Sequence, residues 1–222
     1  MKVSIISYSK PSREMYSEGL NDIQELVAYC ARVSNPSNQL NAGTSAKLIK
    51  YLVAHQHWSP LEMVSVCLEV TTTRDIARQM LRHRSFSFQE FSQRYADPTK
   101  DLSFILREAR LQDPKNRQNS VETDDGLLQR RWMEKQKHVI DTAKDAYNWA
   151  IDHGIAKEQA RAVLPEGNTV SRLYMNGTLR SWIHYIQLRS ANGTQKEHME
   201  IAIACALVIA EIFPLTKEFV SE

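Results

Sequence analysis

The sequence of 222 residues has little of what marks the specialised classes of protein. Glycine and proline number only seven each, which excludes a collagen-like, linker-rich or low-complexity chain. Basic and acidic residues nearly balance, at 28 against 26, and leave a formal net charge of +2. A dedicated nucleic-acid-binding protein normally carries a larger basic excess. We therefore expect no nucleic-acid partner, and we expect any bound anion to be small and local.

Cysteines and long apolar runs are also scarce. The three cysteines, Cys30, Cys67 and Cys205, are scattered and never form a C-x-x-C pair, which argues against a disulfide framework and favours a reducing compartment. The longest apolar stretch, residues 201–210, is about half the length that a membrane span needs. Residues 1–7 alternate like a strand and lack the features of a signal peptide. We predict a cytoplasmic protein with no membrane partner.

The spacing of apolar residues predicts the secondary structure. Strands are expected over residues 1–7, 63–71 and 168–177, and helices around residues 20–30, 48–57, 72–81, 127–153, 157–164, 179–186 and 195–213. Because the strands do not alternate regularly with helices, we expect an α+β fold, with a mainly antiparallel sheet flanked by several helices. The length favours a single domain over residues 1–222.

Several local features carry further expectations. The polar, irregular residues 97–125 are the best candidate for a mobile loop or insertion. Ser59 begins a sequence typical of a capping box. Trp132, Trp149 and Trp182 lie at helical spacing and are expected to pack in the core.

One segment, residues 79–95, concentrates cations and aromatic rings. Its cations are Arg82, His83, Arg84 and Arg94, and they are interleaved with Phe86, Phe88, Phe91 and Tyr95. Guanidinium groups bind phosphate in a bidentate manner and stack on flat rings, so the pattern suits a flat anionic ligand such as a nucleotide or a flavin. Two alternatives remain open, a solvated basic helix end and a surface for single-stranded nucleic acid.

The longer spacing resembles the signature of one family. Arg82-His83-Arg84, followed after seven residues by Ser92 and after one more by Arg94, is similar to the motif of the flavin-dependent thymidylate synthases. Residues 55–62, 160–165 and 179–189 resemble further elements of that family in the same order. The resemblance covers nearly the whole chain. It implies a thymidylate-synthase-complementing-protein-like fold, and a homotetramer with active sites at the subunit junctions.

The resemblance also implies an activity and its residues. Members of the family methylate dUMP to dTMP, with methylenetetrahydrofolate as the one-carbon donor and a reduced FAD, regenerated by NADPH, as the hydride source. The implied flavin-binding residues are His57, Ser59, Arg82, His83, Arg84, Glu90, Thr178, Arg180 and His184. The implied dUMP-binding residues are Gln79, Arg82, Glu90, Phe91, Ser92, Gln93, Arg94, Arg161 and Arg189. Arg189 matches the catalytic arginine that polarises the uracil and favours loss of its N3 proton.

Physical arguments bear on some of these roles. Arg180 and His184 are four residues apart and share a helix face, whereas Arg189 is nearly opposite to Arg180 and should serve a different ligand or a different subunit's site. None of the cysteines lies in a setting that would activate a thiolate, so no cysteine nucleophile is expected. A nucleophilic role for Ser92 is less favoured than phosphate or sugar binding, since no base is evident.

Two other kinds of site are weakly supported. The pair His55 and His57 lacks further ligands nearby in the sequence, so no metal site is expected. No G-x-G-x-x-G motif occurs, so a Rossmann dinucleotide site is unsupported. A flavoprotein reductase that consumes NADPH without methylating a nucleotide remains an alternative function.

Overall fold

The central feature of the computed structural model, which describes residues 1–221, is a four-stranded antiparallel sheet. Its order is β1 (Lys2–Tyr8), β2 (Ser65–Thr73), β6 (Val170–Thr178) and β3 (Ser87–Glu90). A separate two-stranded hairpin consists of β4 (Arg110–Gln112) and β5 (Ser120–Glu122). The predicted α+β class with an antiparallel sheet is confirmed.

Helices account for most of the remaining structure. The α-helices are α1 (Arg13–Ser17), α2 (Ile23–Ala31), α3 (Ser45–Ala54), α4 (Arg74–Met80), α5 (Pro98–Asp101), α6 (Gly126–Asp152), α7 (Lys157–Ala160), α8 (Leu179–Ser190) and α9 (Lys196–Ile209). The short 3-10 helices are η1 (Pro36–Asn38), η2 (Ala42–Thr44), η3 (Ser59–Glu62), η4 (Arg161–Val163) and η5 (Pro214–Phe219). No helix among the described residues is long and apolar enough to cross a membrane.

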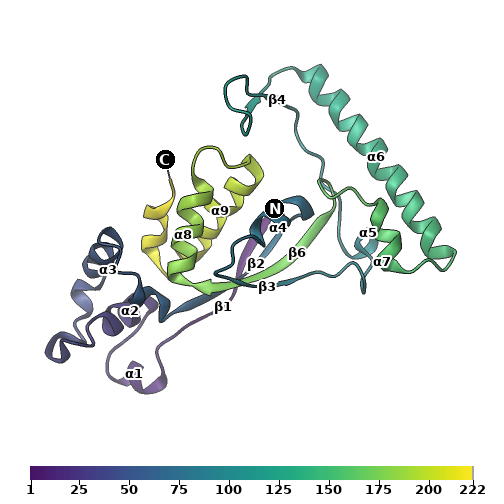
Figure 1. The fold of residues 1–222 in the computed structure, drawn as a ribbon. Coiled ribbons are helices and arrows are strands. Elements are labelled where there is room, and N and C mark those ends of the chain that lie inside the picture. The colour runs from purple at the N-terminus through teal and green to yellow at the C-terminus, as the bar shows by residue number, and fades with distance from the viewer. Residues whose placement is uncertain (222) are drawn as a thin grey trace.

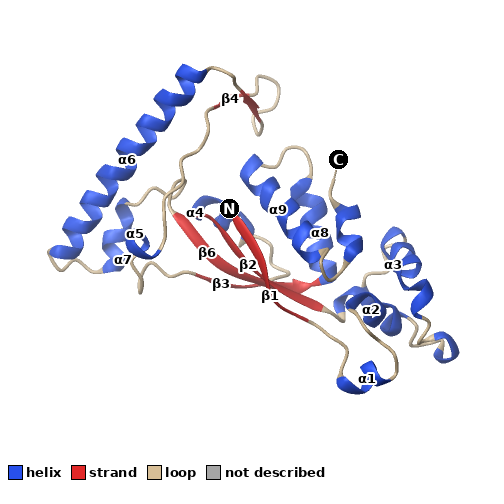
Figure 2. Ribbon diagram, turned by 180° about the vertical axis from the view of Figure 1, so that it is seen from behind, coloured by secondary structure: helices blue, strands red, loops and turns tan. Residues whose placement is uncertain are grey.

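The helices form three groups around the sheet (Figures 1 and 2). The pair α8 and α9 packs over the sheet, where α9 contacts β1 and β2 and α8 contacts β6. The helices α1, α2 and α3 gather beyond one end of the sheet, and α6 stands away from it beyond the other end, next to α7. The chain between α5 and α6 extends as an arm, residues 104–122, that carries the β4–β5 hairpin back toward α9 (Figure 1).

The core lies between the sheet and the α8–α9 pair. In β2 the burial alternates, and Val66, Leu68 and Val70 are fully buried toward the helices. Trp182 of α8 is also fully buried, and its indole Nε1 donates a hydrogen bond of 3.0 Å to the backbone oxygen of Val66. Burial of each such apolar side chain contributes roughly 1.5–3 kcal/mol, so this layer fixes α8 against the sheet.

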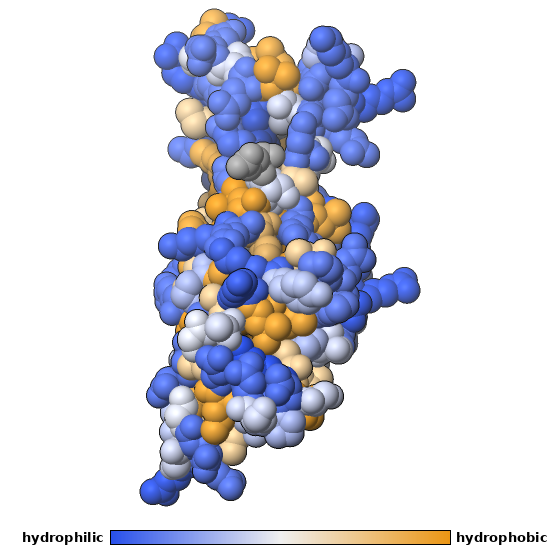
Figure 3. Space-filling view, turned by 90° about the vertical axis from the view of Figure 1, so that its left-hand side faces the viewer, coloured by the Kyte–Doolittle hydropathy of each residue, from blue (hydrophilic) through white to orange (hydrophobic). Residues whose placement is uncertain are grey.

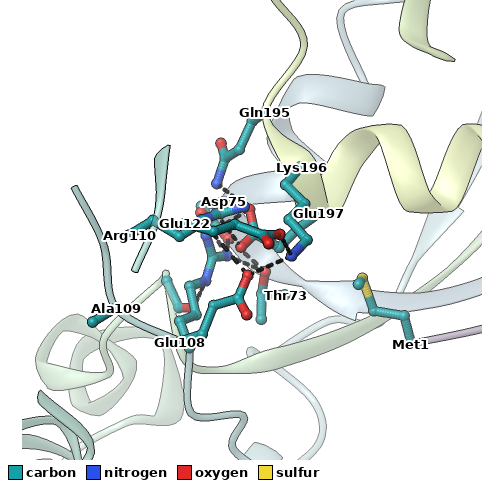
Figure 4. Close-up of polar contacts among 12 residues, drawn as sticks. Met1, Thr73, Asp75, Glu108, Ala109, Arg110, Glu122, Gln195, Lys196 and Glu197 are labelled. Atoms are coloured by element: carbon teal, nitrogen blue, oxygen red, sulfur yellow. Dashed lines mark hydrogen bonds and ion pairs between the residues drawn. The ribbon is translucent and has the colours of Figure 1, made fainter. Parts of the chain in front are cut away.

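Two segments differ from the expectation because tertiary contacts decide them. Residues 87–90 form the edge strand β3, which was not predicted and exists through its pairing with β6. Within residues 97–125, expected to be a mobile loop or insertion, the arm carries the β4–β5 hairpin and forms ion pairs with α9. The ammonium group of Lys196 on α9 lies 2.7 Å from a Glu108 carboxylate oxygen and 2.6 Å from one of Glu122. Figure 4 shows these side chains converging between the arm and α9.

Some local expectations were wrong. Trp182 is buried as predicted, but Trp132 is 43% exposed and Trp149 is 58% exposed. The reason is that α6 stands away from the sheet (Figure 1) and buries only the side that carries Ile140, Tyr147 and their neighbours. Ser59 begins η3 without capping it; Trp58 holds the capping position, and no side-chain hydrogen bond caps this turn.

The close approach of β6 to Phe86 predicts the effect of one substitution. A Cβ at Gly177 would lie 2.6 Å from Phe86 Cε1, and the ring cannot move easily because it packs edge-on against Trp182 at 4.8 Å. Gly177→Ala should therefore lower the free energy of unfolding by about 1–3 kcal/mol in urea denaturation. Gly167→Ala, whose new Cβ meets nothing within 4 Å, is the matched control. Equal stability of the two variants would contradict the packing described here.

Candidate active site

The register between β3 and β6 spreads the motif along the edge of the sheet. Ser87 pairs with Asn176, and Glu90 pairs with Leu173. Because the strands are antiparallel, the start of the motif lies next to the beginning of α8, and its end lies next to the beginning of β6. The candidate site residues therefore fall into three groups: one at the start of α8, one under the end of α8, and one beside α7.

The first group lies where η3 meets the start of α8. Thr178 caps α8 by accepting a hydrogen bond from the Ser181 backbone N–H at 3.3 Å. One turn further along, His184 packs edge-on against Trp58, with ring centroids 4.3 Å apart. His57 and Ser59 flank that tryptophan in the sequence and are exposed.

Arg180 belongs to the same group and already has a counterion. It forms an ion pair with Glu62 of η3. Since Arg180 and His184 both contact residues 58–62, the prediction that they share one face of the helix is confirmed. A phosphate placed there would compete with Glu62 for the guanidinium group, which the sequence did not indicate.

The second group centres on a contact between the motif and the end of α8. The Nε–H of Arg189 donates a hydrogen bond of 2.9 Å to Nε2 of His83, although the two residues are 106 positions apart. The His83 ring also packs edge-on against Tyr185 at 4.9 Å. Arg189 thus faces the motif, whereas Arg180 faces η3. The two arginines therefore have different neighbours, and they are separated by about 14 Å along the helix axis. That they serve different ligands or different subunits' sites stays a prediction.

The histidine in this contact is neutral. Burial and then the positive charge of Arg189 lower the pKa of His83 from 6.5 to about 4. Its Nε2 accepts a hydrogen bond from Arg189, so the ring hydrogen resides on Nδ1. The motif therefore supplies cationic charge through its arginines, while His83 orients Arg189.

Three polar residues beside this contact, Tyr185, Gln195 and His198, were not predicted, although the Gln79 that they surround was. His198 on α9 is fully buried, with Nδ1 3.2 Å from Gln79 Oε1 and Nε2 3.1 Å from the Tyr185 hydroxyl. The Gln79 Nε2 donates to Gln195 Oε1 at 2.8 Å. A histidine on the otherwise apolar buried side of α9 was the available signal, since buried polar groups need partners.

The third group lies at the end of the motif. The Glu90 carboxylate accepts a hydrogen bond of 2.7 Å from Ser171 Oγ and lies within 3.7 Å of Arg74 and 3.6 Å of Arg78. Phe91 follows as a half-buried residue whose backbone N–H donates to the Arg172 carbonyl at 2.8 Å. The backbone of this segment is therefore held in place by β6.

The remaining residues of this group face α7. Ser92 Oγ accepts a hydrogen bond of 3.3 Å from the Arg94 backbone N–H, and the Arg94 guanidinium pairs with Glu158 at 3.3 Å. Glu158 lies on α7, and Arg161 begins η4 directly after that helix. Gln93 is buried, and its Nε2 has no hydrogen-bond partner among residues 1–221.

Several cations of these groups have no internal counterion. Among residues 1–221, no carboxylate pairs with Arg82, Arg84, Arg161 or Arg189 within 4.0 Å, although the same chain neutralises Arg107 and Arg110 fully. Arg82 and Arg84 are also exposed. Guanidinium groups without a counterion are the donors that the phosphates of a flavin and of a nucleoside monophosphate require. The residues present fit both ligands.

The cysteines offer no activated thiolate. Burial raises the pKa of the thiols of Cys30 and Cys67, and it raises that of the fully buried Cys205 far more. Among the described residues there is no cluster of three or more histidine, cysteine, aspartate or glutamate side chains that could hold a metal ion.

The buried histidine on α9 predicts a pH dependence of stability. Burial, Arg189 and His83 lower the pKa of His198 from 6.5 to about 3. Below pH 6.5, His198 is protonated in the unfolded chain but stays neutral in the folded protein. The free energy of unfolding therefore falls as the pH falls. Between pH 7.5 and 5.5 this single group should cost about 1.4 kcal/mol.

The measurement is urea denaturation at both pH values. His198→Asn should lose less stability than the parent on this change of pH, whereas His138→Asn, at an exposed position on α6, should match the parent. The same pH dependence in the parent and in His198→Asn would exclude His198 as its source.

Comparison with known proteins agrees with the geometry. The family model described as "Thymidylate synthase complementing protein" matches residues 17–215. A probable flavin-dependent thymidylate synthase of Paramecium bursaria Chlorella virus 1 is 48% identical over 214 residues, which cover 96% of each chain. A flavin-dependent thymidylate synthase of Synechocystis sp. is likewise 48% identical, with the same coverage.

A solved structure is also similar. The UMP/dUMP methylase PolB of Streptomyces cacaoi, bound with 5-Br dUMP, superposes with a TM-score of 0.79 at 26% identity, over 98% of this chain and 93% of that chain. The fold, the motif and its contact with the end of α8, and the likeness over nearly the full length lead to one conclusion. This chain belongs to the thymidylate synthase complementing protein family, the family of the flavin-dependent thymidylate synthases.

Proposed function

We propose that this enzyme methylates dUMP to dTMP, with FAD as the flavin, methylenetetrahydrofolate as the one-carbon donor and NADPH as the source of reducing equivalents. The observation that carries the proposal is the hydrogen bond between Arg189 and His83. It joins the cationic motif to the end of α8 and leaves a guanidinium group without a carboxylate partner beside it. The names of the similar proteins support the flavin and the uracil nucleotide.

The dUMP would lie along the end of the motif. Ser92 and Arg94, with Arg161 from η4, supply hydroxyl and guanidinium donors suited to a phosphate dianion. The pairing of β3 and of the Phe91 backbone with β6, directly before Ser92, would hold the start of this donor segment in place before the nucleotide binds. Glu90, fixed by Ser171, would accept hydrogen bonds from the sugar or from the flavin. Phe91, Gln93 and Gln79 would complete the pocket.

The flavin would be held by the start of the motif and the start of α8. His57, Ser59, Thr178 and His184 supply a hydroxyl- and ring-lined surface next to Trp58. Arg82, Arg84 and Arg180 supply charge for the phosphates, and His83 lies between them and the nucleotide. FAD held there in reduced form would supply the hydride for the reductive methylation.

The protein's own catalytic contribution is electrostatic. The Arg189 guanidinium stays protonated at any pH of interest, and it would hydrogen-bond a uracil carbonyl oxygen. As the N3 proton leaves, negative charge develops on that oxygen, and a fixed donor stabilises it. His83 accepts from the Arg189 Nε and keeps the other guanidinium N–H groups free for the substrate. The raised thiol pKa values supply no cysteine nucleophile.

We also propose a homotetramer with active sites at subunit junctions. The first group, proposed to hold the flavin, and the third group, proposed to hold the dUMP phosphate, lie at opposite ends of the β3–β6 pair. In one chain each group is therefore open on a surface. Large apolar side chains are exposed on α6, including Leu127, Trp132 and Val139, and the face drawn in Figure 3 shows further apolar patches among polar side chains. Partner chains that cover such surfaces would complete the site. A cytoplasmic location remains a prediction from the cysteine content.

The first test is spectroscopic and enzymatic. Purified protein reconstituted with FAD should show flavin absorbance that changes when dUMP is added. It should oxidise NADPH in a dUMP-dependent manner and form dTMP when methylenetetrahydrofolate is present. Failure to bind flavin would exclude the proposed function. Oxidation of NADPH that is indifferent to dUMP, without label transfer from the folate, would instead indicate the flavoprotein reductase.

Variants of Arg189 and Arg94 separate chemistry from binding. Arg189→Ala should retain FAD but lose at least about a hundredfold in kcat, because it removes a donor to the developing oxyanion. Arg94→Ala should instead weaken dUMP binding at least about tenfold, because it removes a phosphate contact.

The control is Arg172→Ala, which changes an exposed arginine of β6 that is paired with Glu69. It should change neither kcat nor dUMP binding. Normal turnover of Arg189→Ala would remove Arg189 from the mechanism.

A further inference from the structure

A chain of five polar side chains runs from the core to the arm through Gln79. It connects Tyr185, His198, Gln79, Gln195 and Glu197 through contacts of 3.1, 3.2, 2.8 and 2.9 Å. The side chains of this hydrogen-bonded series come in turn from α8, from α9, from α4 and again from the start of α9. Figure 4 shows its last two members, Gln195 and Glu197, beside the arginine and glutamates of the arm.

The terminal carboxylate is held ionised. Arg110 donates a hydrogen bond to Glu197 Oε1, and Arg107 lies 3.7 Å from Oε2. Burial alone would raise the pKa of Glu197, but the hydrogen bonds from Arg110, from its own backbone N–H and from Gln195, with the charge of Arg107, outweigh it and lower the pKa. Glu197 is therefore a pure hydrogen-bond acceptor.

One acceptor at the end determines the direction of every bond. Gln195 must turn its amide nitrogen to Glu197, so its oxygen faces Gln79. Gln79 must then present its nitrogen to Gln195 and its oxygen to His198, which donates through Nδ1–H. His198 is left with a lone pair on Nε2, which accepts a hydrogen bond from the Tyr185 hydroxyl. A reversed amide at Gln79 would oppose two oxygens across its contact with Gln195.

The fixed amide of Gln79 retains one N–H and one oxygen lone pair for a ligand. Gln79 is half-buried, and through His198 it lies in the same cluster as His83 and Arg189. Uracil and cytosine differ in this respect, because position 4 carries an acceptor oxygen in uracil and a donor amino group in cytosine. If the nitrogen and oxygen of the Gln79 amide cannot exchange places, its N–H can donate to the position-4 oxygen of uracil. The same N–H would face the position-4 amino group of cytosine, which is another donor.

We propose that Glu197, acting through Gln195, fixes the Gln79 amide so that the site selects a uracil over a cytosine nucleotide. Glu197 is a positioning residue here and does not touch the substrate. This inference rests on the proposed function, because it places the base of dUMP beside Gln79 and Arg189. It adds that the preference for uracil depends on a residue outside the nucleotide site, at the contact between the arm and α9.

Glu197→Gln tests this device directly. With an amide at the end, the whole chain can run in either direction, since Gln195 can flip, His198 can change tautomer and the Tyr185 hydroxyl can accept as well as donate. With two orientations of Gln79 equally populated, dUMP affinity should fall only about twofold. The dissociation constant for dCMP should fall, and the ratio of the dCMP to the dUMP constant should drop at least about tenfold.

Two further variants keep the test decisive. Gln195→Leu cuts the chain while it leaves the ion pairs of Glu197 with Arg107 and Arg110 intact, so it should fold and show the same loss of discrimination even if Glu197→Gln does not fold. Lys196→Gln removes the neighbouring ion pairs with Glu108 and Glu122 but does not touch the chain. It controls for loosening of the arm and should keep the parental ratio.

The measurement is calorimetric titration of the FAD-loaded protein with dUMP and with dCMP. A drop of the ratio in Glu197→Gln and Gln195→Leu, but not in Lys196→Gln, is the expected result. A ratio within twofold of the parent in the folded chain variants, an equal drop in Lys196→Gln, or no preference for dUMP in the parent would overturn the inference and leave the proposed function standing. Absence of dUMP binding by the parent would instead overturn the proposed function, and this inference with it.

Discussion

The pairing of β6 with its two neighbours is the constraint on which the site depends. β6 holds β3, and with it the cationic motif, at the edge of the sheet, and it continues at Thr178 directly into α8. One strand therefore sets the position of both halves of the site. The absence of a side chain at Gly177 lets Phe86 cross close over β6, and this crossing directs the start of the motif under α8. The contact between His83 and Arg189 follows from that geometry.

The layer behind the motif is polar but internally satisfied. His83 and His198 are neutral because they are buried and because Arg189 lies close to both. Each has a hydrogen-bond partner, so the cost of burying a polar group is largely offset. The positive charge of the site consequently resides on arginines, which stay charged and offer directed donors. The histidines orient those arginines and the amide of Gln79, and they do not serve as cations.

Much of the site and fold could be predicted, and the failures have a common physical reason. Apolar periodicity predicted the long helix α6, since periodicity is local. It could not say what covers the helix, and so the expected burial of Trp132 and Trp149 was wrong. The edge strand β3 and the hairpin of the arm escaped prediction because they depend on pairing with β6 and on ion pairs to Lys196. His198 was missed because its two hydrogen-bond partners, Gln79 and Tyr185, come from two other helices, α4 and α8.

By itself, the sequence determined the α+β class and, through the spacing of Arg82, Ser92 and Arg94, the family. It also determined the opposed faces of Arg180 and Arg189, because helical geometry follows from position alone. Only the tertiary structure decided that Arg189 meets His83, that Arg180 pairs with Glu62, and that one carboxylate directs the amide of Gln79. These outcomes depend on burial and on partners distant in the chain, and no local pattern encodes either of them.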